Sequence, residues 1–174
     1  MRWSQLRKRL RERFAESVRK RVDVHQTRYR NAHDEEGELW FSVDGSRLLS
    51  SGSATYLLKL GFLVEESRAK GASWAEAYDK AWPVMEASGL MLLEQMNRDL
   101  FDSLNQTVEE MAQHGNPLVR GLAVLDRRFG KRRLAAFEVS AEHELVQALV
   151  RFRCEAEGLK APVQVGEEDR GHKL

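Results

Sequence analysis

The sequence contains a single cysteine, Cys154, so it cannot form an internal disulfide. The residues around Cys154 at helical spacing are apolar, which favours a buried thiol over a catalytic nucleophile. No apolar run approaches the length of a membrane span, and the first residues lack the apolar core of a secretion signal. We therefore expect a soluble, cytoplasmic protein with no membrane partner.

Catalytic motifs that can be recognised from their spacing are also missing. The sequence has no G-x-x-x-x-G-K-[ST], no G-x-G-x-x-G, no G-x-S-x-G, no H-E-x-x-H and no C-x-x-C. His114 and His143 each lie near an expected helix end, where capping or the helix dipole accounts for them without catalysis. The sequence therefore predicts no catalytic residue, no metal ligand and no cofactor.

The N-terminal segment has the spacing of an amphipathic helix. Ser4 is the expected N-cap, and the helix is expected to continue to about Lys20. Its buried stripe, at spacings of three and four, is expected to be Trp3, Leu6, Leu10, Phe14 and Val18.

A period of two follows, which indicates β-strands. Val22 and Val24 alternate with His25, Thr27 and Tyr29, and after a polar loop a second alternation places Leu39, Phe41 and Val43 on one face. The dipeptide Asp44-Gly45 predicts a tight hairpin. A short third strand over 46–50, with Leu48 as its apolar member, completes an antiparallel meander.

Helical spacing then continues to the end of the ordered chain. Capping signals predict helix starts at Ser73 with Glu76, at Thr107 with Glu110, and at Asn116-Pro117. Breaks or kinks are expected at Gly71, Pro83, Gly89 and Gly115, and Gly130 and Gly158 are expected to end later helices. Trp74 and Trp82 lie two turns apart on one face, which favours an aromatic core over a surface for stacking ligands.

The predicted fold class is therefore α+β and mostly helical. An N-terminal helix and a small antiparallel meander form residues 1–53, and a multi-helix array forms residues 54–160. We expect the two parts to pack as one compact domain. Residues 161–174 are expected to be a flexible tail.

Charge is unevenly distributed although the net charge is only +1. Residues 1–30 carry 11 Lys/Arg and 3 Asp/Glu, whereas residues 31–119 carry 6 and 15. Such segregation indicates either a basic surface or two oppositely charged parts that attract each other on folding. The densest cationic run is Arg127, Arg128, Lys131, Arg132 and Arg133. It is a candidate site for an anion or an acidic partner, and the alternative is a solvated helix end.

Several segments also resemble a known family. The runs MRWSQLRKRL, HDEEGELWFSVDG and NPLVRGLAVLDRRFGKRRL look like those of a family of uncharacterised bacterial proteins of this length. The resemblance implies a bacterial, cytoplasmic, single-domain protein. It implies no activity and no site residues.

Three functional hypotheses follow. The first is a non-enzymatic interaction or regulatory protein that recognises a protein partner through a charge-segregated surface. The second is an RNA- or DNA-binding protein in which the basic helix over residues 4–20, Arg28, Arg30 and the 127–133 cluster form one patch that contacts phosphates, while Trp40 or Tyr29 stacks on bases. If the two basic segments lie on opposite faces, this patch does not exist. The third is a metal-dependent hydrolase built on the ligand types His25, His33, Asp34, Glu35 and Glu36.

Overall fold

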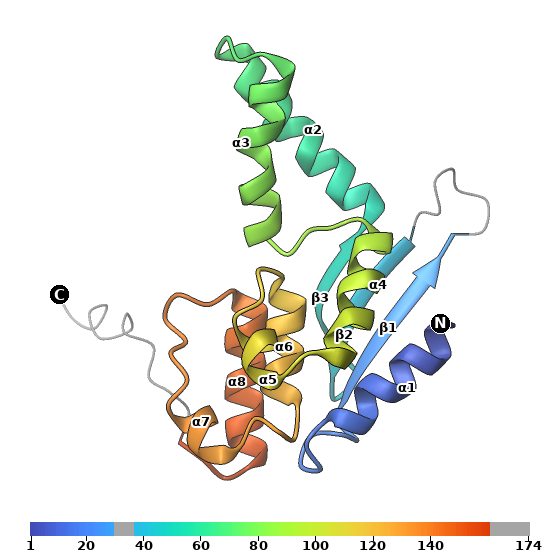
Figure 1. Cartoon of the computed structure of the whole chain (residues 1–174), viewed down its shortest axis with the longest axis vertical. Helices are drawn as coiled ribbons and strands as arrows, with labels where there is room; N and C mark the ends of the chain where they lie inside the picture. Colours follow the sequence, from blue (N-terminus) through green and yellow to red (C-terminus); the bar gives the residue numbers. More distant parts are fainter. Residues whose placement is uncertain (30–36, 161–174) are drawn as a thin grey trace, which may run out of the picture.

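The structure, a computed structural model, describes residues 1–29 and 37–160. It is α+β and mostly helical, as the sequence predicts (Figure 1). The elements are α1 (Trp3–Arg13), β1 (Val22–Arg28), β2 (Gly37–Val43), β3 (Ser46–Gly52), α2 (Ser53–Ala69), α3 (Trp74–Ala87), α4 (Leu93–Asp102), a 3₁₀ turn (Ser103–Asn105), α5 (Val108–Ala112), α6 (Pro117–Leu125), α7 (Lys131–Ala135) and α8 (Glu144–Ala156). Within the two described ranges, no helix has the length and apolar content needed to cross a membrane.

Helix α1 is shorter than predicted and starts two residues earlier than a Ser4 cap would place it. Arg2 is the N-cap, and the helix ends at Arg13 instead of near Lys20. The end is set by a tertiary contact: Phe14 adopts an extended conformation, forms an isolated β-bridge with Asp126, and the next amide, of Ala15, donates to the carbonyl of Leu125 at 2.8 Å. The apolar stripe is nevertheless placed as predicted, because Leu6, Leu10, Phe14 and Val18 are buried and Trp3 packs against the core.

The predicted meander is present, with strand order β1-β2-β3 and antiparallel pairing throughout. Asp44 and Gly45 both have positive φ, of 48° and 81°, as a two-residue hairpin with matching twist requires. The third strand extends to Gly52, and Leu48 is exposed, so its predicted role as the inward apolar member is wrong. An irregularity in register between Phe41 and Ser42 offsets β3 against β2, which a simple alternation does not anticipate.

One face of the sheet packs against α1, α4 and α6 to form the main core (Figure 1). Val24 and Phe41 from the sheet share this core with Leu10 of α1, Leu100 of α4 and Leu122 of α6, and all five side chains are buried. Helices α6 and α8 pack closely, since a Cβ on Gly121 would lie 2.9 Å from Cδ1 of Leu149. The core thus extends across the expected boundary at residue 53.

Helices α2 and α3 form a hairpin that projects from the body, and we call it the arm (Figure 1). The start of its second helix, α3, depends on neighbouring residues alone: Ser73 caps the helix and exchanges hydrogen bonds with Glu76, as predicted. Pro83 does not restart the helix, because α3 runs through it to Ala87, and Gly89 with φ of 67° then ends the segment. The arm has its own small cluster of Val64, Ala77 and Ala81, separate from the main core.

Candidate interaction surfaces

The predicted basic cluster lies where α6 gives way to α7. Asn116 caps α6 and Pro117 is its first residue, as predicted. However, α6 ends at Leu125, before the cations, and Gly130 is the N-cap of α7 rather than the terminator of α6. Arg127 and Arg128 are therefore in a turn, and Lys131, Arg132 and Arg133 are in a separate five-residue helix. The expected placement of Arg127 and Arg128 in the last turn of a helix ended by Gly130 is therefore wrong.

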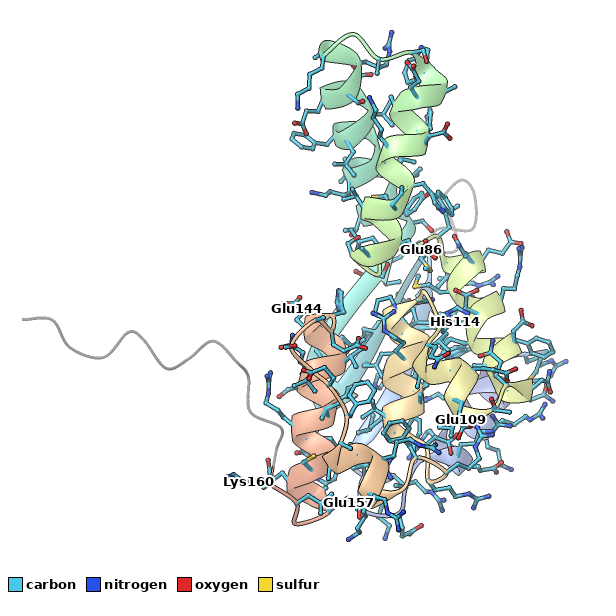
Figure 2. All side chains as sticks on the ribbon, turned by 60° about the vertical axis from the view of Figure 1, so that its left-hand side comes forward. Glu86, Glu109, His114, Glu144, Glu157 and Lys160 are labelled. Carbon is cyan, nitrogen blue, oxygen red and sulfur yellow. The ribbon has the colours of Figure 1, made fainter. Side chains whose placement is uncertain are left out.

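Three of the five cations have carboxylate partners within the protein. Arg128 is paired with Asp126 at 2.7 Å, Arg133 with Glu109 at 2.7 Å, and Lys131 with Glu157 at 3.1 Å. Glu109 and Glu157 lie at the end of the body away from the arm (Figure 2). The pairs of Arg133 and Lys131 hold α5, α7 and the end of α8 together. Within the described residues, only the exposed side chains of Arg127 and Arg132 have no ion pair in the cluster.

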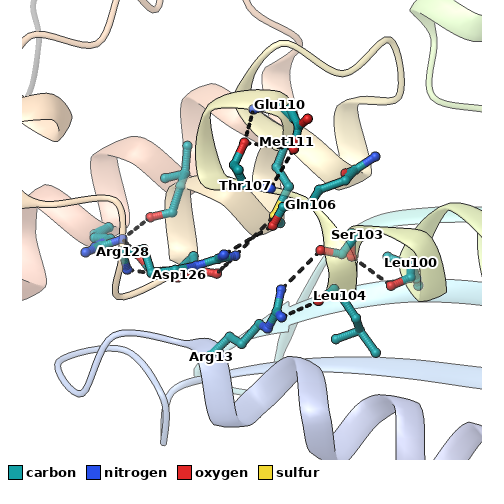
Figure 3. Close-up of polar contacts among 12 residues, drawn as sticks. Arg13, Leu100, Ser103, Leu104, Gln106, Thr107, Glu110, Met111, Asp126 and Arg128 are labelled. Atoms are coloured by element: carbon teal, nitrogen blue, oxygen red, sulfur yellow. Dashed lines mark hydrogen bonds and ion pairs between the residues drawn. The ribbon is translucent and has the colours of Figure 1, made fainter.

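The cluster meets the basic N-terminal helix along one seam. The amide of Arg127 donates to the carbonyl of Arg13 at 2.8 Å, beside the Phe14–Asp126 bridge. The Arg13 guanidinium donates to the carbonyls of Ser103, at 3.1 Å, and Leu104 (Figure 3). Burial, followed by the nearby charges of Arg128, Arg9 and Arg127, lowers the pKa of Arg13, against an opposing effect of Asp126. Two basic segments far apart in sequence therefore do converge.

The other two predicted cations are not part of this seam. Arg28 ends β1 and lies with residues 1–3, at the opposite end of α1 from Arg13. Arg30 lies outside the described residues, as do His33, Asp34, Glu35 and Glu36 of the proposed metal-dependent hydrolase. No group of three or more metal-ligating side chains occurs within the described ranges. The structure thus brings together only the 127–133 members of the predicted site.

The turn that presents the cluster depends on Arg153, which sequence reasoning did not identify. Its guanidinium is buried and donates to the carbonyls of Val124, Asp126 at 2.7 Å, and Phe129 at 2.8 Å. Burial lowers the pKa of Arg153, opposed by the nearby Glu157 carboxylate. Because these carbonyls belong to the last turn of α6 and to the turn after it, Arg153 supplies hydrogen bonds that the helix cannot supply itself. Cys154 beside it is buried, as predicted, and burial raises the pKa of its thiol.

Trp40, predicted as a base-stacking residue, already has neighbours on its ring. His25 on β1 stacks on it with ring centroids 5.2 Å apart and an interplanar angle of 11°, and the Arg47 guanidinium on β3 lies 4.4 Å from the ring centroid. The His25 ring also contacts the hydroxyl of Ser42 at 2.8 Å. These contacts within the sheet account for the presence of His25 and Trp40 without a bound base or metal. Tyr29, in contrast, is exposed.

The largest departure from prediction is the apolar surface of the arm. Trp74 and Trp82 are 51% and 49% exposed, so their assignment to an aromatic core is wrong. Seven of the twelve exposed large apolar residues in the described ranges lie on the arm, and these seven are Leu57, Leu58, Phe62, Trp74, Tyr78, Trp82 and Val84. These rings lie outside the contact between α2 and α3, because the small side chains of Ala77 and Ala81 occupy the side of α3 that faces α2.

The exposed residues form two ridges at helical spacing. Trp74, Tyr78 and Trp82 recur every four residues along α3, and Trp74 stacks on Tyr78 at 6.1 Å with the Arg68 guanidinium 3.9 Å from the Trp74 ring. Leu58 and Phe62 form the second ridge, on α2. A sequence signal existed, because the run YLLKLGFLV places apolar residues all around α2, more than one buried face needs.

Comparison with known proteins places the chain in one family. The model of the SF0329 protein family matches residues 2–154, so the chain belongs to this family, and the expected resemblance to a known family is confirmed in that respect. No curated protein and no solved structure matches the chain. The family description names no activity, so membership alone gives the surfaces described above no function.

Proposed function

We propose that this SF0329-family protein is a non-enzymatic interaction protein that recognises a protein partner with the apolar ridges of its arm. One observation carries the proposal: seven large apolar side chains are exposed on a hairpin that projects from a body with its own core. Soluble monomers rarely expose apolar side chains in such density unless the surface binds something. Aromatic side chains are also enriched where binding energy concentrates.

The chemistry of the arm favours a protein partner over a polyanion. Residues 53–87 carry four Lys/Arg and five Asp/Glu, so the arm has no excess of positive charge. Several of these charges are paired locally, as in Lys70 with Glu66 at 2.7 Å and Arg68 with Glu65 at 3.7 Å. A partner is therefore recognised mainly by apolar contacts, and we expect it to offer an apolar helix face or groove. A bacterial, cytoplasmic setting remains part of the proposal.

Site-specific photo-crosslinking in cells that naturally make the protein tests this directly. A photoreactive phenylalanine analogue replaces Phe62 in one variant and Trp82 in another, and a third carries it at the exposed Arg151 on α8 as the control position. We expect one protein adduct of the same mass at both arm positions and none at position 151. We also expect Leu58→Lys to abolish the adduct without lowering the melting temperature, since Leu58 is 76% exposed.

Two results would overturn the proposal. The first is absence of any protein adduct at either arm position in a protein that melts normally. The second is an adduct that forms equally at position 151 or survives Leu58→Lys, since neither depends on the apolar ridges.

A second candidate, nucleic-acid binding, is favoured by the seam between α1 and the 127–133 cluster. Arg128, Arg9 and Arg127 lie near enough to Arg13 for their charges to add to the effect of burial in lowering its pKa. Against this, Arg128 is paired with Asp126 and Arg13 is bonded to backbone carbonyls. The seam thus offers a smaller cationic surface than the sequence suggests. No described contact favours the metal-dependent hydrolase.

A further inference from the structure

A cleft between the start of α1 and α4 lies outside both surfaces described above. Its volume is about 550 Å³, within the range of small-molecule sites. Residues from three elements line it: Trp3 from α1, Gln26 and Arg28 from the end of β1, and Asn97, Arg98 and Phe101 from α4. None belongs to the arm, so this inference is independent of the proposed partner.

Strand β1, which lines the cleft, departs there from its pattern of buried apolar residues. Val22 and Val24 point into the main core, and the same face of β1 continues with Gln26 and Arg28, which are polar. The Oε1 atom of Gln26 is buried and has no hydrogen-bond partner within the described residues. A buried acceptor without a partner costs about 1–3 kcal/mol of stability. A position that violates local pattern at such a cost is expected at a binding site.

The walls combine flat apolar surface with positive charge. Trp3 packs partly on the core, and Phe101 on the facing helix is 40% exposed. Arg2, Arg28 and Arg98 lie around the cleft together with one carboxylate, that of Glu94, whose Oε1 is 3.3 Å from a guanidinium nitrogen of Arg98. Arg2 and Arg98 therefore place cations at the rim of the cleft, beside the aromatic side chains. Asn97 and Gln26 add amides, each of which offers both a donor and an acceptor to the edge of a planar ring.

We propose that this cleft binds a nucleoside 5′-monophosphate, free or at the end of an RNA chain. The base lies against Trp3 and Phe101, its edge hydrogen-bonds to Gln26 and Asn97, and the phosphate is held by the arginines at the rim. Each part of the ligand has a matching group: a π-face for the aromatic walls, N–H donors for the unpartnered Oε1 of Gln26, and an anion for the cations.

Isothermal titration calorimetry of the full chain with AMP, GMP, CMP and UMP tests the proposal, with adenosine and inorganic phosphate as partial ligands. We expect at least one nucleotide to bind more tightly than either partial ligand. Arg98→Gln is expected to weaken that nucleotide about tenfold while leaving the nucleoside unchanged, because it removes a contact to phosphate only. Arg151→Gln, a cation removed from α8 instead, is the matched control and is expected to bind normally.

Gln26→Leu separates binding from a structural role. It replaces an unpartnered buried acceptor with an apolar side chain on the core face, so the melting temperature is expected to rise while nucleotide affinity falls about tenfold. A 5′-phosphorylated RNA tetramer that binds at least as tightly as the free nucleotide would identify RNA ends as the source of the ligand. Weaker RNA binding would identify the free nucleotide.

The proposal is overturned if none of the four nucleotides binds at millimolar concentration to folded protein. It is also overturned if Arg98→Gln and Gln26→Leu both bind like the unmodified chain, or if inorganic phosphate binds as tightly as every nucleotide.

Discussion

Asp23 on β1 shows how single charges join the elements of the body. Its carboxylate accepts a hydrogen bond from Nε of Arg7 at 2.9 Å, and a guanidinium nitrogen of Arg11 lies 3.6 Å away. Burial raises the pKa of Asp23, but hydrogen bonds from Arg7 and the Val24 amide, with the charges of Arg7 and Arg11, outweigh it and leave the pKa below its ordinary value. The ionised form of Asp23 therefore stabilises the folded protein.

We expect Asp23→Asn to lower the free energy of unfolding at pH 7 by about 0.5–1.5 kcal/mol, because the amide loses the charge but keeps one acceptor. A carboxyl group with a lowered folded pKa stabilises above its unfolded value, near 3.9, and the effect is lost as pH falls through the folded pKa. The difference between the two proteins is thus expected to be constant from pH 7 to about pH 5. It should shrink toward pH 3 in urea titrations.

Glu16→Gln supplies the comparison for this pH profile. Glu16 pairs with Arg19 at 3.1 Å, but its side chain is 79% exposed, so the substitution is expected to change stability very little at any pH. A difference for Asp23→Asn that stays constant down to pH 3 would show that the carboxylate does not stabilise through its charge.

Two glycines show how close packing differs between the elements of the body and the arm. A Cβ on Gly37, at the start of β2, would overlap the carbonyl oxygen of Thr27 and lie 2.6 Å from Cδ2 of Leu93. A Cβ on Gly61, inside α2, would meet no atom within 4 Å. The first glycine is required by the approach of β1 and α4, whereas the second leaves open space on the arm.

Opposite effects on stability are therefore expected. Gly37→Ala is expected to destabilise by about 1–3 kcal/mol through overpacking, because the backbone of β1 cannot move without breaking the ladder. Gly61→Ala is expected to stabilise by about 0.5–1 kcal/mol, because alanine has the higher helix propensity and nothing obstructs it. Guanidinium denaturation of both variants measures the difference. A destabilised Gly61→Ala would mean that the arm packs against something in the isolated protein.

At the scale of the whole molecule, the uneven charge of the sequence is partly neutralised on folding. Arg21 of the basic N-terminal segment pairs with Asp44 of the acidic middle at 2.6 Å, and Arg133 pairs with Glu109 of that middle at 2.7 Å. The exposed cations that remain at the seam include Arg9, Arg127 and Arg132. The interpretation that the segments attract each other is thus supported by contacts, and the basic surface is correspondingly reduced.

If the seam binds RNA, affinity for a generic single strand is expected to fall roughly tenfold between about 50 and 200 mM salt, as a few phosphate contacts predict. Arg127→Ala with Arg132→Ala is expected to reduce the slope of log affinity against log salt by about one to two. The double variant Lys59→Ala with Lys80→Ala removes two cations from the arm instead and controls for the change in net charge. No binding at 50 mM salt, or equal losses in both double variants, would remove the seam from consideration.

Much of the secondary structure could be predicted because its signals act over a few residues. The caps at Ser73, Thr107 and Asn116 satisfy amides within their own first turn, so neighbouring sequence suffices to identify them. The turn at Asp44-Gly45 likewise depends on the φ preferences of its own residues. The alternation of buried and half-buried positions in β1 and β2 follows from the two-residue period of any strand.

The candidate sites depended on contacts between distant segments. Arg13 and Arg127 share a seam because β-bridge pairing at Phe14 ends α1 early, and Arg153 holds the turn that follows α6. Neither contact leaves a trace in local spacing. The basic cluster was found from sequence because charge density is visible there, but its ion pairs were not.

What the sequence by itself determined is most of the elements, with α7 as an exception: their types, the capped starts of α3, α5 and α6, the meander and the stripe that buries α1. Only the tertiary structure decided which apolar faces are covered. Trp74 and Trp82 have the spacing of core residues, and they are about half exposed because α2 meets α3 through Ala77 and Ala81 instead. Periodicity specifies that a helix has an apolar face, whereas burial depends on where the rest of the chain lies.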